Sequence, residues 1–194
     1  MASTPEIRLP IGRITTGLFL VLMVLVVLDL TTPFDHFSMF LEANVPTWFE
    51  TFLMTTAAIF LGIAAIDAHH HRSGFVDRWG ALSAIFLFLS LDEASQIHER
   101  LTPLIRPLIG VEDGWLYYSW VVAGAVALVL LAAAYFTWWR ALEPKVRMWV
   151  AVAAVCFAAG ALGAESLSAP LDPFTPGSGF ETVSLLEETL EMSG

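Results

Sequence analysis

Long apolar blocks alternate with short polar stretches along this chain. Five of the blocks contain about 20 mostly apolar residues each, which is the length that an α-helix needs to cross a lipid bilayer. They cover residues 11–30, 48–66, 80–98, 116–139 and 148–167. The pattern predicts an all-α protein, namely a polytopic bundle of transmembrane helices that forms a single integral membrane domain over residues 1–194.

A sixth apolar segment covers residues 180–194 and is shorter than the others. At about 1.5 Å per residue it reaches only ~20 Å, which is too short to cross a bilayer. Two interpretations remain open: the segment continues beyond the sequence given, or it is a half-helix that docks in the bundle. Its length favours the first interpretation.

The overall composition agrees with a membrane protein. Hydrophobic residues make up 57% of the 194 residues and charged residues 14%, whereas a soluble domain is nearer 45–50% apolar and about 25% charged. The lipid bilayer is therefore the expected partner. The formal net charge of −10 argues against nucleic acid as a ligand. The single cysteine, Cys156, excludes an intrachain disulfide.

Basic residues gather in the loops of one predicted side. Seven of the nine lie before or at the start of the first span, between the second and third spans, or between the fourth and fifth: Arg8, Arg13, Arg72, Arg78, Arg140, Lys145 and Arg147. Loops rich in Lys and Arg stay in the cytoplasm. We therefore expect a cytoplasmic N-terminus, with the acidic and proline-rich loops on the outer side.

Acidic residues and one histidine gather at the outer ends of the spans. Ionisable residues within a membrane cost roughly 2.5–3.5 kcal/mol each on insertion scales, and they usually mark a functional site. The third span entering from the cytoplasm and the last segment entering from outside place their acids at a similar depth, roughly 12 Å below the outer surface. The candidate site residues are Asp92, Glu93, His98, Glu99, Glu165, Glu187, Glu188 and Glu191.

These residues are the donor types that suit a divalent metal such as Zn, Mn or Fe. Such a site would support hydrolytic or redox chemistry on a lipid-like or periplasmic substrate, with His98 as a ligand or general base. The Glu-x-x-His pairs of ferritin-like di-iron proteins are absent, because Ser95 precedes His98 by three positions and Gln96 follows Glu93 by three.

Three other interpretations remain open. The acids could form a structural knot of hydrogen-bonded, partly protonated side chains. They could line a proton or cation pathway, although the inner halves of the spans are almost wholly apolar. The chain could also be a non-catalytic accessory or scaffolding subunit that binds other membrane subunits in a larger complex. The sequence does not decide whether the protein is an enzyme.

Two short motifs carry a resemblance to known proteins. They are Leu-Asp-Glu-Ala-Ser-Gln-Ile-His-Glu at residues 91–99 and Leu-Glu-Glu-Thr-Leu-Glu-Met at residues 186–192. The pair resembles signatures in small multi-span membrane proteins of bacteria, for which no activity is implied. The resemblance, together with the predicted spans, implies a multi-pass protein of the bacterial inner membrane.

Overall fold

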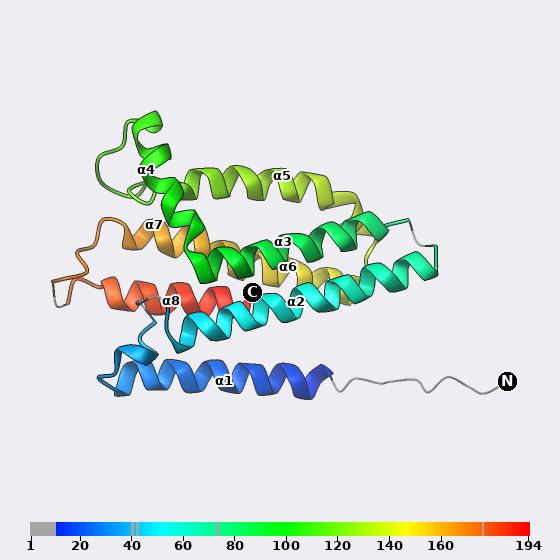
Figure 1. Cartoon of the computed structure of the whole chain (residues 1–194), viewed down its shortest axis with the longest axis horizontal. Helices are drawn as coiled ribbons and strands as arrows, with labels where there is room; N and C mark the ends of the chain where they lie inside the picture. The colour runs from blue at the N-terminus through cyan, green and yellow to red at the C-terminus, as the bar shows by residue number, and fades with distance from the viewer. Residues whose placement is uncertain (1–10, 40, 42, 73, 176) are drawn as a thin grey trace.

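The computed structural model describes residues 11–39, 41, 43–72, 74–175 and 177–194. Within those residues the chain is helical and contains no strand, which confirms the all-α prediction. Long helices run roughly side by side and short connections join them at the two ends (Figure 1). The elements are α1 (Ile11–Thr31), η1 (Asp35–Phe37), α2 (Val45–His70), α3 (Val76–Ser95), α4 (Ile97–Ile109), α5 (Trp120–Ala141), α6 (Pro144–Ala158), η2 (Ala159–Ala164), α7 (Glu165–Ser168) and α8 (Phe180–Ser193).

Four continuous helical segments in the described chain are long and apolar enough to cross a membrane, and the bent pair α3 and α4 would make a fifth. The four are Gly12–Thr31, Val45–His70, Trp120–Ala141 and Pro144–Ser168. Only 6–22% of each apolar window is buried inside the protein. Side chains such as Leu, Ile and Phe therefore cover the outside of the bundle, as lipid contact requires.

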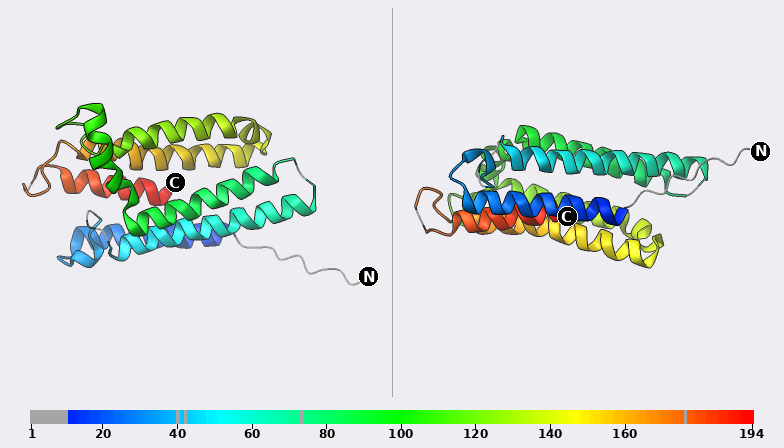
Figure 2. Two further views of the ribbon diagram at one scale, coloured as in Figure 1. Left: turned by 45° about the horizontal axis from the view of Figure 1, so that its top comes forward. Right: turned by 90° about the horizontal axis from the view of Figure 1, so that it is seen from below.

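The helices α2 and α3 form a hairpin and pack along their length (Figure 2). Small and hydroxylated residues let the two backbones approach. Ser83 Oγ donates a hydrogen bond to the carbonyl oxygen of Ala58 at 2.7 Å, and Ser90 Oγ donates to that of Thr51 at 3.0 Å. Hydroxyl groups that donate to a carbonyl oxygen of the neighbouring helix in this way have a hydrogen-bond partner without water.

The third predicted span ends earlier than the apolar pattern indicates. The prediction ran to His98, but α3 ends at Ser95 and the chain turns by 83° into α4. Gln96 makes the turn in the left-handed conformation, with φ of 52° and ψ of 44°. The hydrophobic pattern continues through the turn, so it does not reveal a break that depends on one backbone conformation.

The short last helix, α8, lies in the middle of the bundle (Figures 1 and 2). Its Leu185 and Met192 pack against a buried cluster from α1, α2 and their connection, formed by Leu22, Leu25, Met39 and Phe49. On its other side α8 contacts α6, η2 and α7. The predicted segment 180–194 therefore docks as a helix between neighbours, which is one of the two interpretations that the sequence left open.

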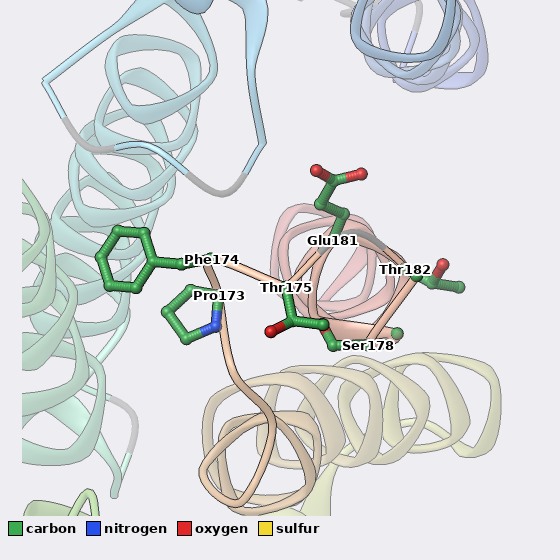
Figure 3. Close-up of a pocket in the computed structure, with 8 residues that line it drawn as sticks. Pro173, Phe174, Thr175, Ser178, Glu181 and Thr182 are labelled. Carbon is green, nitrogen blue, oxygen red and sulfur yellow. The ribbon is translucent and has the colours of Figure 1, made fainter.

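The loop between α7 and α8 encloses a shallow hollow of about 270 Å³ (Figure 3). Asp172 organises the loop, because its two carboxylate oxygens accept hydrogen bonds from the backbone N–H of Phe174 at 2.9 Å and from Thr175 Oγ1 at 2.5 Å. The Phe174 side chain points away from the protein and is 91% exposed. This loop leads directly into the N-terminal end of α8.

Candidate metal centre

Glu50 is the most deeply buried charged residue of the described chain, with 1% of its surface exposed. It lies near the start of α2, where Asn44 Oδ1 accepts a hydrogen bond from the backbone N–H of Thr47 and caps the helix. Neither carboxylate oxygen of Glu50 has a hydrogen-bond partner among the described residues. Burial of a carboxylate without a hydrogen-bond partner costs free energy, so the Glu50 side chain must either bind a ligand or carry a proton.

Three carboxyl groups from three helices meet at this point. Glu50 of α2, Glu93 of α3 and Glu191 of α8 each offer an oxygen atom, and these atoms all lie within 4.8 Å of one another. Glu188 of α8 also interacts with Glu50 and Glu191. Helices that are distant in the sequence thus supply the group, and only the folded bundle assembles it.

The repulsion among the three carboxyl groups is large enough to require a compensating positive charge. At 4.8 Å and an effective dielectric constant of about 20, two carboxylates repel by about 3.5 kcal/mol. Three such pairs amount to roughly 10 kcal/mol, which is comparable with the whole stability of a typical domain. The three carboxyl groups cannot all stay ionised without a compensating charge. A bound cation, or protons on some of the carboxyl groups, must compensate the charge.

A π-helical turn brings α8 close enough to complete the group. In η2, a Cβ atom on Gly160 would lie 2.8 Å from the backbone oxygen of Glu187 and 3.1 Å from the backbone nitrogen of Glu191. Only glycine permits this approach of two backbones. Such π-turns within α-helices occur frequently at functional sites, and this one fixes the depth at which Glu191 sits.

Asp92 and His98 form a pair across the break between α3 and α4. Asp92 Oδ1 accepts a hydrogen bond from the backbone N–H of His98 at 2.8 Å, and Asp92 Oδ2 lies 3.1 Å from His98 Nδ1. The first contact satisfies a backbone N–H in the opening turn of α4, which has no partner within its own helix. The second fixes the orientation of the imidazole ring.

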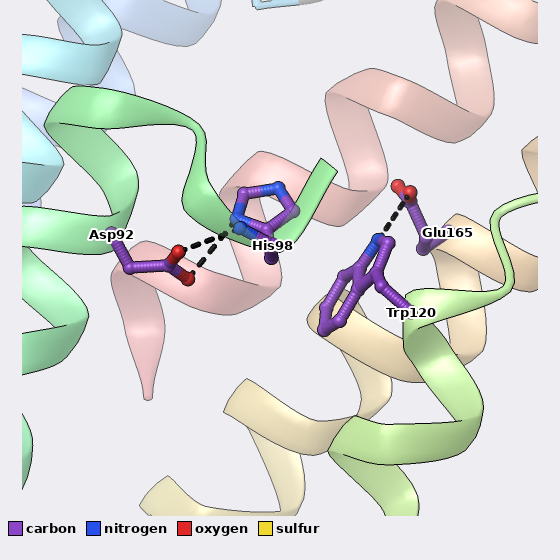
Figure 4. A network of polar contacts seen from close by, with 4 residues as sticks. All are labelled: Asp92, His98, Trp120 and Glu165. Atoms are coloured by element: carbon purple, nitrogen blue, oxygen red, sulfur yellow. Dashed lines mark hydrogen bonds and ion pairs between the residues drawn. The ribbon is translucent and has the colours of Figure 1, made fainter. Parts of the chain in front are cut away.

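The aromatic ring of Trp120 connects this pair to α7 (Figure 4). The ring centroids of His98 and Trp120 are 4.7 Å apart, and Trp120 Nε1 donates a hydrogen bond to Glu165 Oε1 at 3.0 Å. Residues from α3, α4, α5 and α7 thus form a polar network beside the carboxylate group. Glu93 is an electrostatic neighbour both of His98 and of Glu50.

The eight candidate residues from the sequence do not form a single constellation. Glu93 and Glu191 belong to the three-carboxylate group, and Glu187 and Glu188 are electrostatic neighbours of Glu191 on α8. The other four lie elsewhere. Asp92 pairs with His98, Glu165 bonds to Trp120, and Glu99 is exposed.

Sequence reasoning did not include Glu50 and Trp120 in the site. Glu50 stands at the beginning of the predicted second span (48–66), so its depth was the available signal. Which side of α2 faces α3 and α8 depends on packing, and an almost uniformly apolar helix does not show it. Trp120 stands near the start of the predicted fourth span, where aromatic residues commonly form a belt at the membrane surface, and that pattern does not indicate its bond to Glu165.

A protein-family model described as a domain of unknown function (DUF8692) matches residues 16–194. A search of the curated proteins and a search of the solved structures each find no match. The function is therefore inferred from the site itself.

Proposed function

Because the chain belongs to the DUF8692 family, whose description assigns no activity, we propose a function from its geometry: it is an integral membrane protein that binds a divalent cation through Glu50, Glu93 and Glu191. The single observation that carries the proposal is the Glu50 carboxyl group, which is fully buried, has no hydrogen-bond partner among the described residues and lies against two further carboxyl groups.

A cation explains the group better than a structural knot does. A knot of partly protonated carboxyl groups has only their own protons as donors, because an ionised carboxylate is an acceptor only. Within the described part of the chain, no lysine or arginine appears among the groups that interact with Glu50 or Glu191. A divalent cation neutralises the repulsion and satisfies several oxygen atoms at once, whereas protons on single carboxyl groups leave most of the lone pairs unsatisfied.

The proposal extends to the chemistry and the location of the site. A divalent cation at this position would polarise a water molecule or a substrate oxygen for hydrolytic or redox chemistry. Glu50 lies near the start of α2 and Glu93 near the end of α3, and these helix ends lie on the side of the bundle that carries the α3–α4 break and the α7–α8 loop (Figure 1). A substrate would therefore be lipid-like or periplasmic.

We further propose a multi-pass protein of the bacterial inner membrane with a cytoplasmic N-terminus, and the distribution of charge supports this orientation. The α2–α3 and α5–α6 connections lie at the end of the bundle from which α1 starts, opposite the α3–α4 break (Figure 1). That end carries Arg13, Arg72, Arg78, Arg140, Lys145 and Arg147, and basic loops favour the cytoplasm. Arg8 lies outside the described residues.

The test is the metal content of detergent-purified protein, measured by elemental analysis. We expect about one divalent cation per chain, and its loss in Glu50→Gln, which removes the charge but keeps the shape of the side chain. Glu99→Gln is the matched control, because it makes the same change at an exposed carboxyl group of α4. Protein that folds but holds no cation, even after addition of divalent salts, would overturn the proposal.

The same purification addresses the alternative of an accessory or scaffolding subunit. That function requires partner subunits that stay bound in mild detergent. The exposed apolar helix faces fit lipid contact as well as subunit contact, so they do not favour this alternative.

A further inference from the structure

The donor atoms of the carboxylate group determine which cation it suits. Every atom within the group is a carboxylate oxygen, and among the described residues no histidine nitrogen or cysteine sulfur joins it. Oxygen ligands suit hard cations such as Mg²⁺, Ca²⁺ and Mn²⁺, whereas Zn²⁺ sites usually include imidazole or thiolate. The observed group therefore differs from the carboxylate and histidine site that the sequence indicated.

His98 is the histidine that the sequence assigned to the site, and in the structure its contacts are with other residues. Its Nδ1 atom faces Asp92 Oδ2, its backbone N–H bonds to Asp92 Oδ1, and its ring lies against Trp120. Three contacts thus fix the residue from the side of α3 and α5. Its electrostatic contact with Glu93 places it next to the ligands but outside their group.

The number of oxygen atoms in the group adds a second argument. Three glutamates offer two oxygen atoms each, and Glu188 interacts with two of them. Ca²⁺ takes six to eight oxygen ligands and Mn²⁺ prefers similar donors. A site within the bundle can satisfy such a cation with bidentate carboxylates and needs few water molecules.

We propose that the Glu50, Glu93 and Glu191 site is an all-oxygen site for a hard divalent cation of the Ca²⁺ and Mn²⁺ class, and that His98 is not a ligand. This inference rests on the proposed cation-binding function and specifies it. It separates the carboxylates, which bind the cation, from the Asp92 and His98 pair, which lies beside them.

The experiment uses Mn²⁺ as a paramagnetic probe on the full-length protein in detergent. Continuous-wave electron paramagnetic resonance measures binding, and pulsed measurements detect any ¹⁴N nucleus coordinated to the ion. We expect bound Mn²⁺ without ¹⁴N coupling, and displacement of Mn²⁺ by Ca²⁺. We expect His98→Gln to change the affinity by less than about threefold, and Glu93→Gln to weaken it at least about tenfold, as the loss of one charged ligand should.

Two results would overturn the inference while leaving the proposed function in place. One is a ¹⁴N coupling that disappears in His98→Gln, which would make the histidine a ligand. The other is stoichiometric binding of Zn²⁺ by protein that binds neither Mn²⁺ nor Ca²⁺. Failure to bind all three cations would instead remove the proposed function itself, so the two failures are distinguishable.

Discussion

At the scale of single residues, Asp92 shows how a carboxylate in the membrane can serve the fold. Its side chain accepts the hydrogen bond from the backbone N–H of His98 that a capping residue would otherwise accept. Gln96, at the capping position itself, makes no such side-chain bond. Asp92 therefore stabilises the break between α3 and α4, independently of any cation.

Substitution of Asp92 tests this role. Asp92→Ala removes the acceptor, and by analogy with lost helix caps we expect destabilisation by about 0.5–2 kcal/mol. Asp92→Asn keeps an oxygen acceptor for the N–H of His98, so it should lose less. Thermal unfolding in detergent, followed by circular dichroism, measures both variants. Equal losses in the two would show that the charge, rather than the capping bond, matters.

The residue scale is also where the sequence predicts least about the site. Depth along the spans brought Glu93 and Glu191 to one level, and they do meet. Depth did not separate Glu99, which is exposed, from Glu50, which is completely buried. That difference depends on the rotation of each helix about its axis, and on the 83° turn that carries Glu99 away from α3.

At the scale of the elements, the contact of η2 with α8 sets the geometry of the site. We expect Gly160→Ala to push α8 away, because the added methyl group would meet the α8 backbone. The expected cost is roughly 1–3 kcal/mol of stability, as for overpacked cores, together with weaker cation binding. Melting temperature and Mn²⁺ affinity measure the two effects.

Gly163 provides the matched control for Gly160. It lies in the same π-helical turn, but a Cβ atom there would meet nothing within 4 Å. Gly163→Ala should therefore be neutral or slightly stabilising, because alanine favours helices over glycine by about 1 kcal/mol. Similar losses in both variants would mean that the turn itself requires glycine, and that contact with α8 is not the cause.

The α7–α8 loop depends on the ionisation of Asp172. Hydrogen bonds from Thr175 and from the backbone of Phe174 hold the pKa of Asp172 below its ordinary value. The ionised form is thus favoured in the folded loop. Its contribution to stability is present above the ordinary pKa of about 3.9 and is lost as the pH falls through the lowered folded value.

A nuclear magnetic resonance titration of the Asp172 carboxyl ¹³C shift checks this expectation. Its midpoint should lie below that of an unperturbed aspartate, and Thr175→Val should move it upward, because the largest cause of the shift is removed. An unchanged midpoint in Thr175→Val would contradict the role of that hydroxyl group.

The sequence predicts the elements better than it predicts their junctions. Each long apolar block is largely helical in the structure, because backbone groups in lipid must bond within their own segment, but the third block is divided at Gln96. The break at Gln96 and the π-turn at residues 159–164 are not visible in the pattern. Both depend on tertiary contacts, namely the Asp92 bonds at the first and the close approach of α8 at the second.

At the scale of the whole molecule, orientation in the membrane can be measured directly. The chain has a single cysteine, Cys156, so Cys156→Ser gives a background for single-cysteine labelling. In intact bacterial cells, a membrane-impermeant maleimide should label Phe174→Cys in the α7–α8 loop. His71→Cys, at the α2–α3 turn, should react only after permeabilisation. The reverse pattern would invert the proposed topology.

The acidity of α8 has a consequence for how the protein is made. The helix Phe180–Ser193 carries Glu181, Glu187, Glu188 and Glu191 and no basic residue. At the translocon each deep acid costs roughly 2.5–3.5 kcal/mol, so α8 cannot partition into lipid by itself. We therefore expect it to dock against α1, α2 and α6 after those helices have been inserted. Docking of α8 would then be the step that completes the carboxylate group.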